Sequence, residues 1–374
     1  MAKNKKSSSS FLKKPMDFPL LVVILLLLTI GLIMVLSASS PSALSESGDS
    51  YKYFSKQLLF AVAGIGAMFA ISKFDYRKLK KFYKYAYVLA IILLLFVLVG
   101  GRSVNGAKRW IYLSESISFQ PSEMVKMLMI IFYAGILTIN RDKLSSYKNG
   151  FLWHLCLLGP IVLLLMVQPH FSASIVIVGI CSIMMIVAGC KFKHFLLTAG
   201  SVGIPGIIGM IIFSPYRLQR VVTFLDPWQD KAGDGWQVIQ SLYAIGSGGL
   251  FGAGLGESKQ KFLYIPEPHN DFIFSILGEE LGFVGCAIVM VLFAIFIWRG
   301  VLVAMKAPDM FGSLLAVGIT SLIGIQAIIN IAVVTSSMPA TGMPLPFFSY
   351  GGTALFILLC EMGVLLNISR AGNK

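Results

Sequence analysis

Residues 236–285 read WQVIQSLYAIGSGGLFGAGLGESKQKFLYIPEPHNDFIFSILGEELGFVG, a glycine-rich and charged segment in a chain that is otherwise strongly apolar. A polar stretch of this length between membrane spans needs water or a soluble face to satisfy its backbone. It runs into an apolar segment at Asp271, and Glu267 and His269 come just before that point. A carboxylate at the mouth of a membrane helix is costly, which makes Asp271 a candidate functional residue.

The rest of the chain has the composition of a protein that crosses the membrane many times. Of its 374 residues, 56% are hydrophobic and 13% are charged, and the mean hydropathy is +0.81. We therefore expect an all-α polytopic membrane protein whose spans form one domain. The net charge of +14 sits mainly in short loops between apolar runs, where it faces anionic lipid, so nucleic-acid binding is not expected. The five cysteines lie in or beside apolar runs and are expected to pack as small apolar residues.

Apolar runs of about 20 residues predict ten transmembrane helices. They lie at 17–38, 57–73, 84–100, 121–139, 151–168, 171–189, 194–213, 271–298, 310–336 and 345–369. The first run is too long for the apolar region of a signal peptide, so we expect it to be retained as a span. Residues 1–16 form a basic, serine-rich tail, 17–369 the membrane domain, and 370–374 a second short tail.

The distribution of lysine and arginine predicts that both termini lie in the cytoplasm. With this orientation, most of the 31 basic residues fall in the tails and the inner turns. A long loop at about 214–270 then lies outside, with shorter outer loops at 39–56, 101–120 and 337–344. Every segment with unusual chemistry faces this side, away from cytoplasmic ATP, and the chain contains no GxxxxGK[ST] or HExxH motif.

An ion pair is predicted where the fourth span begins. The loop before it contains NGAKRWI at 105–111, and QPSEMVK follows at 120–126. Glu123 and Lys126 are spaced i,i+3 and share a helix face. They form either a helix-start cap with a compensating ion pair, or a site in which Lys126 and Arg109 hold an anionic head group. We favour the second reading, because a buried ion pair contributes little stability by itself.

Two arginines follow the seventh expected span, in YRLQR at 216–220. Arg217 and Arg220 are three residues apart and could chelate phosphate oxygens in a bidentate manner. They could equally contact lipid head groups at the membrane surface, and the spacing does not separate these two roles.

The segment YIPEPHNDF at 264–272 carries the strongest candidate site. Asp271 is either the N-cap of the following helix or, if it faces a cavity, a general base. Glu279 and Glu280 are adjacent and point in different directions, so at least one should face the bundle interior or a polar partner. The proline- and glycine-rich segment 338–352, which includes Ser349, is expected to form a second wall of the same site, because non-helical backbone at this depth must line a cavity or be buried.

Seven segments together resemble the SEDS family of shape, elongation, division and sporulation proteins, which includes FtsW, RodA and SpoVE. They occur in the family's order and are NGAKRWI, QPSEMVK, RVVTFLDPW, QSLYAIGSGGLFGAGLG, ESKQKFLYIPEPHNDFIF, GEELGFVG and TGMPLPFFSYGG. The form GESKQKFLYIPEPH is more similar to the FtsW/SpoVE branch. The chain departs from the family at His170, where QPD is usual, and at Asn270, where HND replaces HTD.

The resemblance implies a glycosyltransferase that polymerises lipid II into peptidoglycan strands on the outer side of the bacterial cytoplasmic membrane. It implies that Asp271 matches the family's essential aspartate. Arg109 and Trp110 match the arginine and tryptophan of NGAKRW, and Glu123 and Lys126 match the family's charged pair. We expect Arg109, Trp110, Glu123 and Lys126 to bind substrate. A second set of residues on the outer loops is expected to bind it as well, namely Arg217, Arg220, Glu267, His269 and Ser349.

The implied reaction also suggests what should accompany the chain. A divalent cation, Mg²⁺ or Mn²⁺, would suit the departing pyrophosphate, although the sequence shows no ligand cluster for it. The expected partners are a class B penicillin-binding transpeptidase and membrane lipid. Two other functions stay open: a lipid II flippase or transporter, for which the sequence shows no internal repeat, and a scaffold for a transpeptidase.

Overall fold

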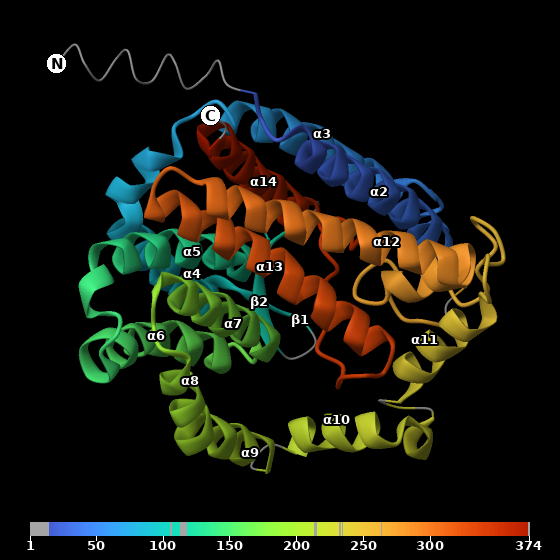
Figure 1. Ribbon diagram of the computed structural model, residues 1–374. Coiled ribbons are helices and arrows are strands. Elements are labelled where there is room, and N and C mark those ends of the chain that lie inside the picture. The colour runs from blue at the N-terminus through green and yellow to red at the C-terminus, as the bar shows by residue number, and fades with distance from the viewer. Residues whose placement is uncertain are drawn as a thin grey trace.

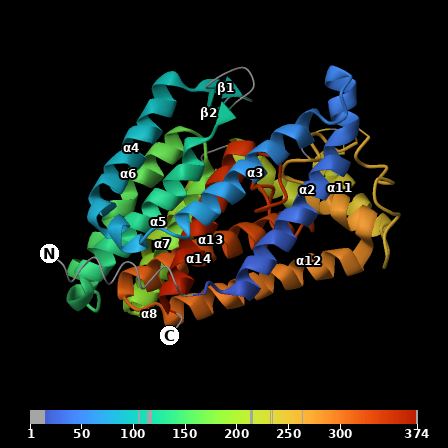
Figure 2. The ribbon, with the colours of Figure 1, turned by 90° about the horizontal axis from the view of Figure 1, so that it is seen from above.

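The computed structural model describes residues 15–104, 107–112, 118–212, 215–231, 233, 235–262 and 264–372. Long helices form one bundle in which α13 and α14 lie centrally, between α12 and α2 on one side and α4 to α6 on the other (Figures 1 and 2). The bounds of the long helices are α2 Phe18–Ser47, α3 Lys52–Ile71, α4 Tyr83–Gly100, α5 Pro121–Ile139, α6 Trp153–Val167, α7 Phe171–Ala188, α12 Ile273–Lys306, α13 Met310–Val334 and α14 Gly352–Gly372.

Shorter elements connect these helices. They are η1 Tyr76–Phe82, β1 Arg102–Val104, β2 Ala107–Tyr112, β3 Ser118–Phe119, η2 Arg141–Lys143, η3 Tyr147–Leu152, α8 Phe192–Thr198, η4 Ala199–Gly203, α9 Ile204–Ile212, α10 Pro215–Leu225, η5 Pro227–Asp230 and α11 Trp236–Ser247. The expected outer loop at 214–270 therefore contains helices α10 and α11.

Nine helices in the described part of the chain are long and apolar enough to cross a membrane, which confirms the polytopic all-α class. The expected span at 194–213 is divided into α8, the π-helical turn η4 and α9, and none of these pieces has the length of a span. Pro205 and several glycines interrupt this run and account for the division. The count of ten spans and the orientation in the membrane stay predictions.

The helices differ in how much surface they bury. Helices α5, α13 and α14 bury most of theirs, whereas α3 and α4 bury the least. Large side chains that are fully enclosed include Tyr133 of α5, Phe311 of α13 and Phe348 of the segment before α14. Apolar side chains on the outer helices face outward, as expected where lipid takes the place of water. The expected span at 345–369 begins later, at Gly352, because 345–351 is non-helical and turns inward against the bundle.

Helix α12 is bent near its start, at Gly282, whose φ of 66° and ψ of −166° are not helical. The bend frees the backbone carbonyls of Glu279 and Glu280 from the helix. Both accept hydrogen bonds from the glycine-rich segment that precedes the helix: Ala253 N–H donates to Glu279 at 2.9 Å, and Gly254 N–H donates to Glu280 at 3.1 Å. A neighbouring segment thus satisfies the polar groups that the bend exposes.

The same glycine-rich segment also accepts hydrogen bonds from the two amides that follow the bend. Phe283 N–H donates to Gly249 at 2.9 Å, and Val284 N–H donates to Leu250 at 3.0 Å. A side chain at Gly252 would put its Cβ 2.1 Å from a carbonyl oxygen of α12, and Gly252 also has a φ of 82°. Only glycine allows this close approach of two backbones. The run GSGGLFGAGLG is therefore a cover for the bend in α12.

Two adjacent carboxylates fasten the next part of the loop to the same helix. Glu280 is fully buried and accepts hydrogen bonds from Ser37 of α2 at 2.6 Å and from Lys261 at 2.9 Å. Glu279 accepts from the backbone N–H of Lys259 at 2.8 Å and from the hydroxyl of Ser258. The expectation that at least one of these glutamates has a polar partner is confirmed for both.

Replacing Lys261 with methionine should destabilise the protein strongly. The change leaves the Glu280 carboxylate buried without its cation, which typically costs about 3–5 kcal/mol. The double replacement Lys261→Met/Glu280→Met removes both charges and should recover most of the loss. Thermal unfolding of the purified proteins in detergent measures both effects, and equal midpoints for Lys261→Met and wild type would show that the pair does not hold the loop.

Candidate functional site

The small sheet places Arg109 beside the turn between α6 and α7. Strands β1, β2 and β3 are antiparallel, with Trp110 opposite Arg102 and Ile111 opposite Phe119. The guanidinium of Arg109 donates to the carbonyl of Pro169 in that turn. This brings the NGAKRWI motif to the start of α7, with Trp110 next to Arg109 on the same strand.

Asp271 lies in the turn before α12 and does not cap that helix. The N-cap position is Phe272, which makes no capping side-chain bond, and the helix begins at Ile273. The expectation that Asp271 marks the helix start is therefore corrected by two residues. The carboxylate is partly buried and is left available for a role other than capping.

Hydrogen bonds to three successive backbone carbonyls hold the turn that carries Asp271. Tyr350 N–H donates to the carbonyl of His269 at 2.9 Å. Ser349 Oγ donates to the carbonyl of Asn270 at 2.7 Å, and Asn330 Nδ2 donates to the carbonyl of Asp271 at 2.7 Å. The segment 338–352 thus lies against this turn, as expected for a second wall of the site.

Asn330 links the two walls. Its Nδ2 also donates to the carbonyl of Met343 at 2.7 Å, and its side chain is 1% exposed. Gly342, on the same wall, has a φ of 64°, and a Cβ there would lie 3.2 Å from Oδ2 of Asp271. The carboxylate therefore sits directly against this wall.

The surroundings of Asp271 raise the pKa of its carboxyl to about 6. Burial is the main cause, because it disfavours the charged form, and the negative charge of Glu267 acts in the same direction. Arg220 and Arg109 oppose the shift. Glu267 is exposed and accepts a hydrogen bond from the side chain of Asn270 at 2.7 Å. A carboxyl with a pKa near 6 is suited to accept a proton near neutral pH.

Arg220 lies between the segment 338–352 and a cavity. Its Nη1 donates to the carbonyl of Ala340 at 2.7 Å. The cavity has a volume of about 390 Å³, and its walls combine aromatic and polar side chains, including those of Arg220, Thr223, Phe224, Trp236, Gln237 and Ser336. Arg217 belongs to α10, but its side chain lies outside the described part of the structure.

The expected pair of Glu123 and Lys126 forms at the start of α5. Nζ of Lys126 lies 2.8 Å and 2.7 Å from the two carboxylate oxygens of Glu123, and the lysine side chain is 2% exposed. His170 lies within the electrostatic field of both Lys126 and Arg109, and burial with these two charges lowers its pKa to about 3. His170 is therefore neutral at physiological pH. Arg109 is the charge that lies near both Asp271 and His170.

His269 is buried between two aromatic rings. Its ring centroid lies 4.6 Å from that of Tyr53 and 5.5 Å from that of Tyr350. Burial lowers the pKa of His269 to about 4, against the opposing charge of Glu46. This enclosed imidazole supports the turn, and a role for His269 in substrate binding stays a prediction.

Two polar residues near these groups were not singled out from the sequence. Asn330 of α13 and Glu361 of α14 both lie in apolar helices and are almost fully buried. Their position inside predicted spans was the available signal, because polar and ionisable residues there are costly and are usually functional. Within the described ranges, no three His, Cys, Asp or Glu side chains gather as a metal would need, and a requirement for Mg²⁺ or Mn²⁺ stays a prediction.

Comparison with known proteins places the chain in a family. Residues 18–374 match the model of the cell cycle protein family of FtsW, RodA and SpoVE. The chain is 46% identical over 356 residues to stage V sporulation protein E of Bacillus subtilis (strain 168), covering 95% of this chain and 97% of that protein. It is 41% identical over 355 residues to the probable peptidoglycan glycosyltransferase FtsW of Geobacter sp. (strain M18), covering 94% and 96%.

Solved structures agree with this result. A chain from a peptidoglycan synthase complex, described as coordinating polymerization and crosslinking, superposes with a TM-score of 0.78 at 28% identity, covering 96% of this chain and 98% of that one. The rod shape determining protein RodA of Thermus thermophilus superposes with a TM-score of 0.70 at 25% identity, covering 95% and 97%. The fold, the matched motifs and these relatives together show that this integral membrane protein belongs to the FtsW/RodA/SpoVE family.

Proposed function

We propose that this chain is a peptidoglycan glycosyltransferase that polymerises lipid II on the outer face of the bacterial cytoplasmic membrane. The observation that carries the proposal is the state of Asp271: a carboxyl with a pKa of about 6, on a turn whose three carbonyls are all held, in the field of two arginines. The relatives named as FtsW glycosyltransferases support the reaction class.

Asp271 acts as the general base in this reaction. The 4-hydroxyl of an acceptor sugar gives its proton to the carboxylate while its oxygen attacks C1 of the donor sugar. The bond between C1 and the phosphate oxygen breaks, and undecaprenyl pyrophosphate leaves with both electrons of that bond. Pyrophosphate is a stable anion and needs no proton to leave, so one carboxylate is sufficient for this single displacement with inversion.

Positive side chains stabilise the charge that develops on the pyrophosphate. Arg109 and Arg220 both act electrostatically on Asp271, and Lys126 acts on His170, as Arg109 does. Such charges act strongly where water is excluded, and Lys126 is almost completely buried. The cavity beside Arg220 offers the aromatic faces of Phe224 and Trp236 for a sugar ring.

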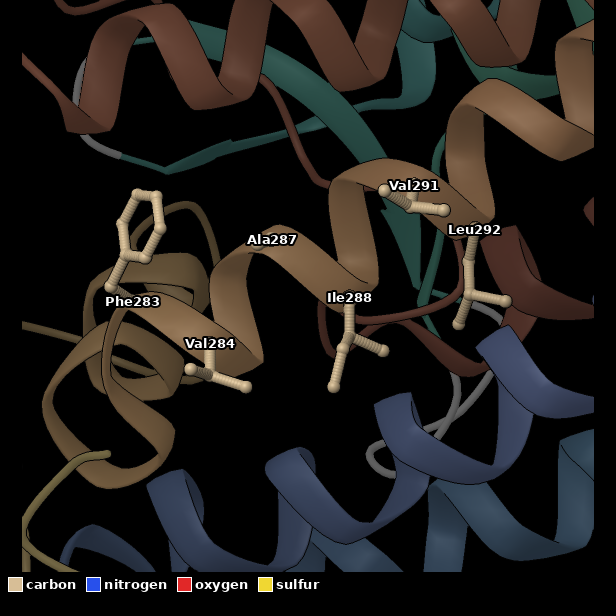
Figure 3. A pocket seen from close by; sticks show the side chains of 6 residues that line it. All are labelled: Phe283, Val284, Ala287, Ile288, Val291 and Leu292. Atoms are coloured by element: carbon tan, nitrogen blue, oxygen red, sulfur yellow. The ribbon is translucent and has the colours of Figure 1, made fainter. Parts of the chain in front are cut away.

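The proposed partner is a class B penicillin-binding transpeptidase, whose single membrane span needs an apolar contact. Figure 3 shows a groove on α12, next to α2, that has a volume of about 320 Å³ and is lined by apolar side chains. Phe283 is 62% exposed and Val291 is 56% exposed. Membrane lipid covers the other outward apolar faces. The similar chain found in a complex that couples polymerization to crosslinking supports this pairing.

Replacing Asp271 with asparagine should reduce lipid II polymerisation by about 10²-fold or more, because the amide cannot accept the proton. The measurement is the length and amount of glycan made from purified lipid II by purified protein, with and without a cognate transpeptidase. Asp142→Asn is the matched control, because Asp142 is exposed beyond the other end of α5. Wild-type activity in Asp271→Asn would reject the base assignment. No glycan from wild type, even with the partner, would favour a flippase, which transport of lipid II in liposomes would then test.

The rate of polymerisation should depend on pH through Asp271. Its pKa of about 6 means that the carboxyl is protonated and inactive as a base below that pH, so the rate should rise as the pH increases through 6 and then level off. Removing the positive charge of Arg220 in Arg220→Gln should move the inflection to higher pH, because this arginine favours the charged form of Asp271. A pH–rate profile of initial rates checks both points, and an inflection that Arg220→Gln leaves in place would contradict the assignment.

Replacing Asn330 with leucine should lower the turnover rate by about 10-fold or more, because the carbonyl of Asp271 loses its donor and the carboxylate is no longer held in position. The effect should fall on kcat rather than on KM, since Asn330 binds the turn and not the substrate. Gln326→Leu, one turn earlier on α13, serves as the control for the new side chain. An unchanged kcat in Asn330→Leu would show that the turn is positioned without it.

A further inference from the structure

Helix α3 packs along α14 and so lies beside the segment that leads into α14 (Figure 1). Its buried positions Gln57, Ala61, Gly64 and Met68 are spaced three and four residues apart and form one face of the helix. Gly64 allows the close approach, because a Cβ there would lie 2.5 Å from a side-chain carbon of Leu359. The first turns of α3 are thereby held against both walls of the candidate site.

Gln57 holds the wall formed by residues 338–352. Its side chain is fully buried, and both ends of its amide form hydrogen bonds. Nε2 donates to the carbonyl of Ser349 at 3.3 Å, and Oε1 accepts from Gly351 N–H at 3.1 Å. The hydroxyl of Ser349 in turn donates to the carbonyl of Asn270 at 2.7 Å. Gln57 therefore reaches the turn before α12 through a single intervening residue.

Tyr53 contacts the same turn directly. It lies four residues before Gln57, on the same face of α3. Its ring centroid is 4.6 Å from that of His269 and 4.9 Å from that of Tyr350, and the latter two rings are 5.5 Å apart. Aromatic rings at these distances stabilise each other beyond the area that they bury. The three rings thus join α3, the turn before α12 and the segment before α14.

A hydrogen bond from α2 fixes the other end of the Tyr53 side chain. The phenol hydroxyl donates to the carboxylate of Glu46, in the last turn of α2, at 2.5 Å. Lys52 lies 3.4 Å from the same carboxylate oxygen, but this pair is exposed and adds little stability by itself. The consequence of the hydrogen bond is local: it holds the Tyr53 ring in contact with His269.

We propose that Tyr53 is a positioning residue that, together with Gln57, braces the turn before α12 against α3 and so keeps Asp271 in its reactive position. Tyr53 acts through His269, which precedes Asp271 by two residues, and Gln57 acts through Ser349. The inference rests on the proposed function, because the role assigned to Asp271 is that of the general base.

The test is to remove the ring and then to restore it without its hydroxyl. Tyr53→Leu should lower the kcat of lipid II polymerisation by about 10-fold and leave KM unchanged, because the base is displaced but no contact with substrate is lost. Tyr53→Phe keeps the ring contacts and should stay within about threefold of wild type. Tyr51→Leu is the matched control, because Tyr51 is 59% exposed at the start of the same helix, and it should change neither constant.

A double-mutant cycle tests whether Tyr53 acts through His269. Residues that act through one another have non-additive effects, so Tyr53→Leu should cost much less in a His269→Ala background than in wild type. The same fold-loss in both backgrounds would overturn the positioning role.

Further outcomes separate this inference from the proposed function. Wild-type kcat in Tyr53→Leu, or a loss that falls on KM instead, would overturn the positioning role while the glycosyltransferase stands. If Tyr53→Leu does not fold, Glu46→Ala replaces it, because Glu46 is exposed and its loss frees only the Tyr53 hydroxyl. This variant should lower kcat by about threefold, and an unchanged kcat would overturn the role. A wild-type protein that makes no glycan at all would reject the proposed function itself.

Discussion

Non-helical backbone between Glu267 and Phe272 packs against α13 and the segment before α14, where each unpaired carbonyl would cost free energy. The protein meets this constraint with donors from elsewhere in the chain: Asn330 of α13, and Ser349 and Tyr350 of the segment before α14. These bonds place Asp271 against Gly342 and leave its side chain uncommitted to the helix. The need to satisfy the backbone therefore fixes the position of the carboxylate on which the proposed chemistry depends.

The same constraint governs the start of α12. Its bend exposes polar backbone that the glycine-rich segment covers, and the side chains of Glu279 and Glu280 hold the following turn. Lys261 and Ser37 complete this arrangement by joining α2 to the loop. Asp271 is the last of the three residues whose carbonyls are held, and the bend in α12 follows it, so the chain is fixed to the bundle on both sides of the carboxylate. A base held in this way loses little entropy when the substrate arrives.

The charges of the site follow a sequence through the interior. The charge of Arg109 acts on both Asp271 and His170, the charge of Lys126 acts on His170, and Lys126 is paired with Glu123. The neutral imidazole of His170 lies in the field of two cations, Arg109 and Lys126. Lys126 is buried and paired with Glu123 in the absence of substrate, and the proposed role of these cations is to stabilise the departing pyrophosphate.

Much of this site could be predicted from the sequence. The composition and the apolar runs determined the polytopic helical class, the spacing of Glu123 and Lys126 determined their pairing on one face of α5, and the polar run around 264–272 identified Asp271. Each of these depends on residues close together in the chain, where helix geometry and the cost of burying charge act locally.

Contacts between segments that are far apart in the chain could be identified only from the tertiary structure. The sequence left open whether Asp271 caps α12, and only the fold shows the helix starting two residues later, with the turn held by α13 and the segment before α14. The division of the expected span at 194–213 was also missed, because apolar composition does not report a π-helical turn. The side chain of Asn330 donates to the carbonyl of Asp271 across 59 residues of chain, and only the packing of α13 against the turn brings the two together. Local physics thus determined the helices and the candidate residues, whereas side-chain burial and backbone hydrogen bonding between remote segments decided which of them act together.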